Sequence, residues 1–262
     1  MLLPMPDVKI ERAGAVAILT IDRPHARNAI GLATMDELDA AFAGLAEGDA
    51  RCAVLTGAGD RAFVAGGDLR ELESMTSEDF AVDMAVRMRR TLDRIAGLPI
   101  PVICALNGAA LGGGAEVAVG CDYRVAAHDA RIGFTQVLLG VMPAWGGIER
   151  LCALVGRGRA LYLLTTGTVL TGREAAEIGL VEESVPRERF EARWRDLAEQ
   201  VARAPRHALE GIKRAVEAAL PGSRPDLEAG AVRDFARAWA DPIHWEMAAE
   251  LERQRRERSK NP

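Results

Sequence analysis

The pattern of hydrophobic positions predicts strands in the first part of the chain. Short apolar runs rich in β-branched residues occupy residues 16–22 and 51–57, and turn residues end each of them. Residues 101–108 form a nearly continuous apolar run, which is typical of a strand buried on both faces. Strands that alternate with helical patterns favour an α/β fold.

Helical spacing fills the gaps between these strands. Leu38, Ala41 and Leu45 recur at helical spacing after the first run, and Thr34 with Glu37 resembles a capping box. A second helix is predicted over residues 77–95 and a third from the glycine run that begins at residue 112.

The second half of the chain has a different pattern. From Gly146 onward it is helical, with one short strand-like piece at residues 180–185. Four amphipathic segments follow, and the sequence predicts helices over them: residues 186–204, 206–220, 225–240 and 242–260. We therefore expect a core domain over residues 1–195 and a C-terminal helical region over residues 196–262, packed on the core or on a neighbouring subunit.

Composition narrows the function classes. The formal net charge is −5 and the pI is near 5.5, which argues against a nucleic-acid partner. No apolar run approaches the ~20 residues of a membrane span, and residues 1–10 lack the pattern of a signal peptide. No zinc-ligand spacing occurs, so no metal is expected. The cysteines form no CxxC pair, so we expect a reduced, cytoplasmic compartment.

One glycine-rich segment carries a single acid. In "NGAALGGGAEVAVGCD", residues 107–122, the glycines are expected to open a helix whose free N–H groups could hold a developing oxyanion. Glu116 would lie in the first turn, with a raised pKa that suits a general acid or base. The simpler alternative is a tight turn with a glutamate stabilised by the helix dipole. Val117 occupies the third glycine position of a dinucleotide fingerprint, so a Rossmann assignment is weak.

Two further segments join the first. In "AFVAGGDL", residues 62–69, Gly67 could offer a second free N–H, and Asp68 with Glu71 could cap a short helix. If the two glycine turns follow adjacent strands of one sheet, their N–H groups could point at one oxygen. The basic loop of "IDRPHARNAI", residues 21–30, reads alone as a solvated turn, but beside the other two it could meet a phosphate-bearing ligand, with His25 near that ligand.

These three segments resemble, in order and spacing, the signature of the crotonase (enoyl-CoA hydratase/isomerase) superfamily. "GVMPAWGGIERL" and "LTGREAAEIGLVEESV" continue the resemblance over nearly the whole chain. It implies an α/β fold built as a spiral of ββα units, with C-terminal helices that form a homotrimer or a homohexamer. It also implies acyl-CoA substrates and no separate cofactor, because CoA is part of the substrate.

The resemblance also implies roles for individual residues. Gly67 and Gly113 match the two amides that polarise the thioester carbonyl. The positions that match CoA contacts are Arg27, Ala29, Ala65, Asp68 and Leu69, and Arg253 matches a residue that reaches a neighbouring subunit's CoA phosphate. Trp145 is expected either to line the acyl pocket or to pack against its own helix. His128, His207 and His244 are expected away from the glycine turns.

One position departs from the family pattern. Of the two glutamates that hydratases use, one matches Glu116, but the other position holds Gln136, which cannot exchange a proton near neutral pH. We rank highest an enoyl-CoA hydratase/isomerase-type lyase with Glu116 as its sole acid/base. The alternatives are a malonyl-type CoA-thioester decarboxylase, similar to the ethylmalonyl-CoA branch at Phe134 and Trp145, and a non-catalytic CoA-ester binding protein.

Overall fold

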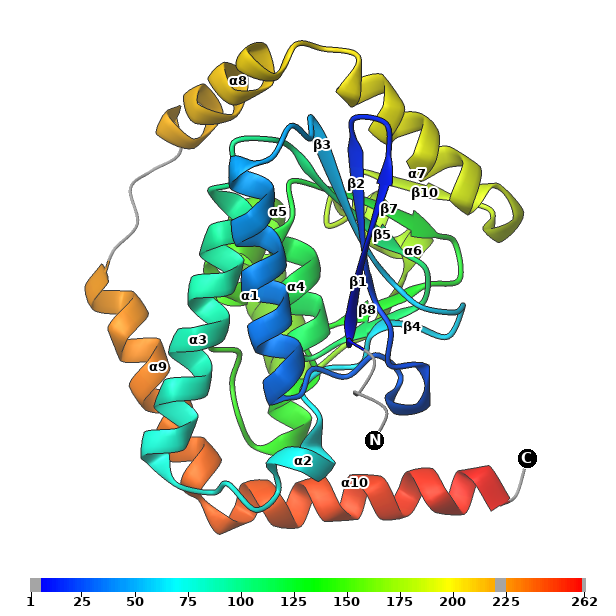
Figure 1. The fold of residues 1–262 in the computed structure, drawn as a ribbon. Helices are drawn as coiled ribbons and strands as arrows, with labels where there is room; N and C mark the ends of the chain where they lie inside the picture. Colours follow the sequence, from blue (N-terminus) through cyan, green and yellow to red (C-terminus); the bar gives the residue numbers. More distant parts are fainter. Residues whose placement is uncertain (1–5, 220–224, 261–262) are drawn as a thin grey trace, which may run out of the picture.

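The structure is a computed structural model that describes residues 6–219 and 225–260. A six-stranded sheet runs through its centre in the order β1-β2-β3-β5-β7-β10 (Figure 1). β1 and β2 form an antiparallel hairpin, and every other neighbouring pair is parallel. The strands are β1 (Val8–Ala13), β2 (Val16–Ile21), β3 (Cys52–Gly57), β5 (Val102–Leu106), β7 (Tyr123–Ala127) and β10 (Glu183–Val185).

A second, smaller sheet has the order β4-β6-β8-β9. Its strands are β4 (Ala62–Val64), β6 (Ala109–Leu111), β8 (Arg131–Gly133) and β9 (Leu170–Thr171). Along the chain, β3, β5 and β7 of the large sheet are each followed by a strand of the small sheet and then by helix. This repeated strand–strand–helix unit confirms the predicted crotonase-type α/β fold.

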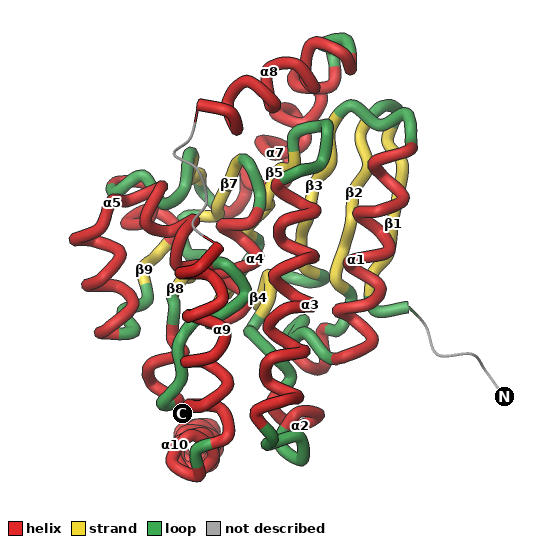
Figure 2. Tube along the Cα trace, turned by 90° about the vertical axis from the view of Figure 1, so that its left-hand side faces the viewer, coloured by secondary structure: helices red, strands yellow, loops and turns green. Residues whose placement is uncertain are grey.

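Helices cover both faces of the large sheet. α1, α3, α4 and α5 lie on one side, where α1 and α3 run in front of the strands (Figure 2). α7 packs against β3 and β7 from the other side. The helices of the core are η1 (Pro24–Ala26), α1 (Leu32–Glu47), α2 (Leu69–Leu72), α3 (Glu78–Ala96), α4 (Gly113–Gly120), η2 (Thr135–Leu139), α5 (Gly147–Thr166), α6 (Gly172–Glu177) and α7 (Arg187–Ala202).

Three more helices lie around this core: α8 (Arg206–Ala219), α9 (Pro225–Ala240) and α10 (Pro242–Lys260). Lys213 fixes α8 to the core through an ion pair with Asp122, 2.7 Å between Nζ and Oδ2. α9 packs along α3, and α10 returns beneath the core to contact η2 (Figure 1). The predicted boundary after residue 195 lies within helix α7, and the next helix begins at Arg206. The division into two domains stays a prediction. Assembly through them stays a prediction.

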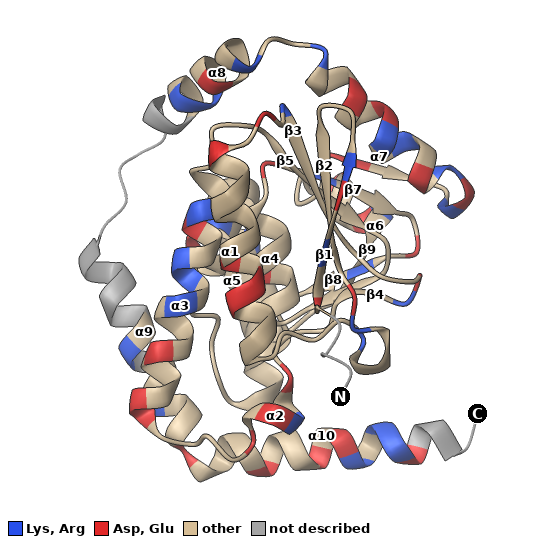
Figure 3. Cartoon of the chain, viewed as in Figure 1, with Lys and Arg blue, Asp and Glu red and all other residues tan. Residues whose placement is uncertain are grey.

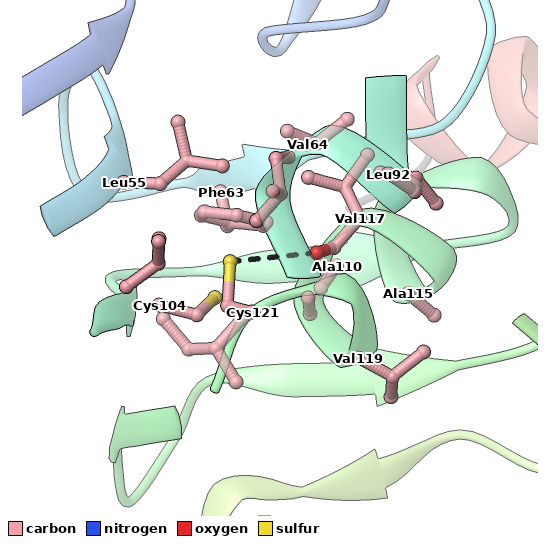
Figure 4. Close-up of a cluster of buried hydrophobic side chains, with 14 of the residues drawn as sticks. Leu55, Phe63, Val64, Leu92, Cys104, Ala110, Ala115, Val117, Val119 and Cys121 are labelled. Carbon is pink, nitrogen blue, oxygen red and sulfur yellow. Dashed lines mark hydrogen bonds between the residues drawn. The ribbon is translucent and has the colours of Figure 1, made fainter. Parts of the chain in front are cut away.

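The hydrophobic core lies between the two sheets and the helices that cover them. All five residues of β5 are buried, as the continuous apolar run predicted. Figure 4 shows this region, where Val64, Val117 and Cys121 pack with other apolar side chains and the Cys121 thiol approaches the carbonyl oxygen of Val117. Figure 3 shows that charged residues gather on the outer helices, whereas the central strands carry few.

The helix starts test the capping predictions. The helix predicted over residues 77–95 is confirmed as α3, and Ser77 caps its start by accepting a hydrogen bond from the Phe80 N–H at 3.2 Å. The Thr34–Glu37 capping box is wrong. α1 begins at Leu32, after Gly31, and the Glu37 carboxylate accepts the Val8 N–H instead.

The capping box predicted at α2 is also wrong. Asp68 precedes α2, but its carboxylate pairs with Arg23 at 2.9 Å and caps nothing. Glu71 accepts the Leu32 N–H at 3.0 Å. In both cases the carboxylates hold a distant segment that the local sequence could not reveal.

Candidate active site

Two glycine turns meet at one edge of the small sheet. β4 and β6 are adjacent and parallel, with Val64 opposite Ala110, so the chain leaves both strands at the same edge. Gly66 (φ +109°) and Gly112 (φ +56°) adopt conformations that favour glycine. A methyl group added at Gly66 would lie 3.8 Å from the Gly113 nitrogen, so the two turns are in contact. The prediction that the turns follow adjacent strands is confirmed.

The N–H groups beyond these turns are available to a ligand. Gly113 is the first residue of α4, so its N–H has no partner within the helix. At the other turn, the Ile30 N–H donates to the Gly66 oxygen at 2.8 Å, and the Asp68 N–H donates to the Ile30 oxygen at 2.9 Å. Neither bond involves the Gly67 N–H, which has no hydrogen-bond partner among the described residues.

Both glycines line one large cavity of about 1000 Å³. Glu116, Gln136 and Trp145 line the same cavity, so the structure brings every predicted catalytic position to one place. That the amides of Gly67 and Gly113 converge on a single oxygen stays a prediction. A cavity of this size is typical of a small-molecule site, and charged as well as apolar residues line it.

Three donors hold the Glu116 carboxylate. The side chain, only 2% exposed, lies in the first turns of α4. Oε2 accepts hydrogen bonds from the Trp145 N–H at 2.8 Å and the Gly147 N–H at 2.9 Å, and Oε1 accepts one from the Gln136 amide at 3.0 Å. A methyl group at Gly147 would lie 2.5 Å from Cγ of Glu116, so glycine permits this close approach.

The surroundings tune this carboxyl group. Burial raises the pKa of Glu116 to about 7, while the N–H groups of Gly147 and Trp145 and the Gln136 amide act in the opposite direction. The raised pKa agrees with the sequence prediction. At neutral pH both protonation states are populated, which is the condition under which one group can take up a proton and return it.

Gln136 contributes a different kind of group. It lies in η2, is 8% exposed, and directs its amide nitrogen to Glu116. Its oxygen, Oε1, is buried and has no hydrogen-bond partner among the described residues. Gln136 therefore offers a bound molecule an acceptor but no exchangeable proton.

Trp145 forms part of the cavity wall. A methyl group at Gly113 would lie 2.2 Å from a ring carbon of Trp145, so the indole packs directly on the start of α4. Of the two predicted roles, the structure supports the pocket wall, because the ring packs on the start of α4 and Trp145 lines the cavity.

The loop at residues 23–28 forms another part of the wall. Arg27 and Asn28 have positive φ values of +54° and +57°. Buried Asn28 holds this shape by donating to the carbonyl oxygens of Ala58 and Ala62 and accepting the Arg23 N–H. The predicted ligand positions Arg27, Ala29, Ala65, Asp68, Leu69 and Trp145 all line the cavity, as does His25.

Arg253 lies elsewhere. It is exposed on α10, is paired with Glu250, and does not line the cavity, although Arg255 and Arg256 of the same helix do. Its predicted contact with a neighbouring subunit stays a prediction.

The C-terminal helices supply cavity residues that the sequence did not reveal. Phe235 and Trp239 of α9 and His244 of α10 line the cavity. The expectation that His244 lies away from the glycine turns is therefore wrong; its side chain is 1% exposed. Phe235 and Trp239 are four residues apart in the sequence, which places them on one face of a helix. Which face of α9 meets the core, however, depends on contacts with distant parts of the chain. His128 bonds to Ser184 instead.

The described residues contain neither a helix suited to span a membrane nor a group of side chains suited to hold a metal ion. None of the helices there is both long enough and apolar enough to cross a membrane. Nor do the described His, Cys, Asp and Glu side chains form a group of three that could hold a metal ion.

Comparison with known proteins gives the family. The model of the family described as enoyl-CoA hydratase/isomerase matches residues 11–236. The short-chain-enoyl-CoA hydratase of Clostridium acetobutylicum is 40% identical over 185 residues, which cover 70% of each chain. The crotonyl-CoA hydratase of Syntrophomonas wolfei is 38% identical over 180 residues, covering 68% of this chain and 69% of the relative.

The fold gives the same result. The crystal structure of an enoyl-CoA hydratase from Bacillus anthracis superposes with a TM-score of 0.80 at 34% identity and covers 91% of each chain. The chain therefore belongs to the enoyl-CoA hydratase/isomerase family of the crotonase superfamily.

Proposed function

We propose that this chain is an acyl-CoA enzyme that stabilises a thioester enolate and moves protons with a single carboxylate, Glu116. The observation that carries the proposal is the pairing of Glu116 with Gln136 beside two glycine turns in one cavity. The names of its relatives, which include hydratases of short-chain enoyl-CoA and crotonyl-CoA, support a CoA thioester as substrate.

The chemistry begins at the thioester oxygen. With this oxygen on the N–H groups of Gly67 and Gly113, negative charge that develops during proton removal is stabilised by preorganised donors. Ionised Glu116 removes a proton from the acyl chain, and the charge moves through the enolate to the oxygen. Protonated Glu116 then returns the proton to another carbon. CoA is part of the substrate, so these steps need no separate cofactor.

One proton-transfer group fits double-bond migration best. Migration needs a proton to leave one carbon and return to another, and a single carboxylate performs both steps. Hydration also requires activation of a water molecule. Gln136 Oε1 can accept a hydrogen bond from that water, but it cannot remove a proton. We therefore expect double-bond migration to be faster than hydration.

A homotrimer, or a hexamer of two trimers, is part of the proposal. α8 exposes apolar side chains, with Ile212 62% and Val216 56% exposed, and α5 exposes Leu161 and Tyr162. Exposed apolar residues grouped on helices support association with another subunit.

A substrate panel tests the function. 3-Enoyl-, 2-enoyl-, 3-hydroxyacyl- and malonyl-type CoA esters are incubated with the native enzyme, with Glu116→Gln and with the control Glu191→Gln, an exposed residue of α7. We expect interconversion of 3- and 2-enoyl-CoA, which Glu116→Gln should slow by about 10²–10⁴-fold and the control should retain. Release of CO₂ alone would identify a decarboxylase, and binding without any turnover would identify a CoA-ester binding protein. Either outcome overturns the proposal.

A further inference from the structure

His244 lines the cavity and carries a buried hydrogen-bond acceptor that no described residue uses. The imidazole is 1% exposed, and its Nδ1 lies 2.6 Å from the carbonyl oxygen of Leu139 at the end of η2. A carbonyl oxygen only accepts, so Nδ1 carries the proton and donates it. In the neutral ring, Nε2 then presents a lone pair. Nε2 is buried and has no hydrogen-bond partner among the described residues.

The neighbouring donors are already engaged. The rings of Trp239 and Trp245 lie 4.9 Å and 4.5 Å from the His244 ring, between centroids. The Trp239 indole N–H donates to the Met75 oxygen at 2.9 Å, and the Trp245 indole N–H donates to the Trp239 oxygen at 3.0 Å. Neither indole can therefore satisfy Nε2. Burial also lowers the pKa of His244, which keeps the ring neutral and the lone pair free.

His244 lies in the same cavity as Glu116, the proposed proton-transfer group. It contacts the end of η2, three residues after Gln136, which corresponds to roughly 6 Å along a 3₁₀ helix. His244, Phe235 and Trp239 all line the cavity that also contains Glu116. A buried polar atom without a partner costs free energy unless a ligand or water supplies the missing bond.

We propose that Nε2 of His244 accepts a hydrogen bond from a hydroxyl group on the acyl chain, distal to the reacting carbons. The substrate class is therefore an acyl-CoA whose apolar chain carries a hydroxyl group beyond the carbons at which Glu116 acts. This inference rests on the proposed function, because it takes the ligand to be an acyl-CoA thioester. His244 is a specificity-determining residue in this account and takes no part in proton transfer.

Binding of unreactive esters tests the inference without turnover. Isothermal titration calorimetry compares butanoyl-, hexanoyl- and octanoyl-CoA with the same esters bearing a terminal hydroxyl. We expect the hydroxylated ester to bind about five- to tenfold more tightly at one chain length, the gain given by one neutral hydrogen bond. Equal or weaker binding at every chain length would overturn the inference.

Two variants separate recognition from folding. His244→Asn keeps a donor near the position of Nδ1 but loses the distal acceptor, so the preference for the hydroxyl should disappear while the melting temperature changes little. His244→Gln keeps a distal acceptor but loses the bond to Leu139, so part of the preference should remain. The reverse pattern would overturn the inference. If the native enzyme shows no preference for the hydroxylated esters but still has Glu116-dependent turnover, this inference is wrong and the proposed function stands. If the native enzyme shows the preference but no turnover, only the proposed function is overturned.

Discussion

The amide of Gln136 donates a hydrogen bond of 3.0 Å to Oε1 of Glu116, inside a cavity where both side chains are buried. One of these groups titrates and the other does not. Burial raises the pKa of Glu116 to about 7, and the Gln136 amide partly opposes the shift by favouring the charged form. The site therefore contains one side chain that exchanges a proton near neutral pH, Glu116, beside one that only donates and accepts hydrogen bonds, Gln136.

Replacing Glu116 tests its catalytic role. Glu116→Gln keeps the shape of the side chain but cannot move a proton, so we expect kcat/KM for double-bond migration to fall by about 10²–10⁴-fold. In the native enzyme kcat/KM should rise with pH through about 7, because the ionised carboxylate removes the proton. A pH–rate profile measures this. Unchanged turnover in the variant would refute the assigned role, and Glu191→Gln is the matched control.

Stability should depend on pH through the same group. The pKa of Glu116 is raised in the fold, so the protonated form is favoured there. Its contribution is fully present below the unfolded pKa of about 4.5 and is lost as pH rises through about 7. Glu116→Gln should therefore unfold like the native protein near pH 4.5 and be more stable by roughly 2–3 kcal/mol at pH 8. Urea unfolding at both pH values measures this, and a gap that does not change with pH would contradict it.

A second carboxylate in place of Gln136 should increase the rate of hydration. Gln136→Glu places an acid/base group against Glu116 Oε1, so we expect hydration of crotonyl-CoA to increase by about 10²–10⁴-fold. Two adjacent carboxylates also raise one of the two pKa values, which should shift the pH optimum upward. Gln136→Met fills similar space without a titratable group and should show no gain. If Gln136→Glu hydrates crotonyl-CoA no faster than the native enzyme, the glutamine does not occupy the position of the missing acid.

The close contact between α4 and β4 predicts a strong effect on folding. A methyl group at Gly114 would lie 1.9 Å from the Val64 carbonyl oxygen, so Gly114→Ala forces the helix away from the strand. We expect a loss of about 1–3 kcal/mol in the free energy of unfolding. Gly44 of α1 has open space around it, and Gly44→Ala should stabilise the protein by about 0.5–1 kcal/mol. Equal effects in chemical unfolding would show that the contact is not tight.

Local signals explain the predictions that the structure confirmed. Ser77 caps its helix with an atom three residues away, and the glycine turns lie directly after short apolar strands, so adjacent residues in the sequence specify both features. The hypothesis that both N–H groups reach one oxygen requires adjacent strands before the two turns, and β4 and β6 are adjacent. Glu116 was found for the same reason, as the single acid in an apolar segment.

Long-range contacts explain the failures. Glu37 and Glu71 match capping patterns, but each accepts a hydrogen bond from a segment about 30 to 40 residues away. His244 reaches the cavity because α10 returns beneath the core to η2, a path that the helical pattern of the sequence does not specify. The predicted boundary after residue 195 lies within α7, where Trp194 and Ala198 are buried, and the division into two domains stays a prediction.

The central claim is that two main-chain amides share one thioester oxygen. A crystal structure of the protein with an unreactive acyl-CoA, such as hexanoyl-CoA, measures this directly. The account predicts the thioester oxygen about 2.7–3.1 Å from the nitrogens of both Gly67 and Gly113, with the acyl α-carbon beside the Glu116 carboxylate. A thioester oxygen that contacts neither nitrogen, or a ligand whose acyl chain lies outside the cavity, would contradict it.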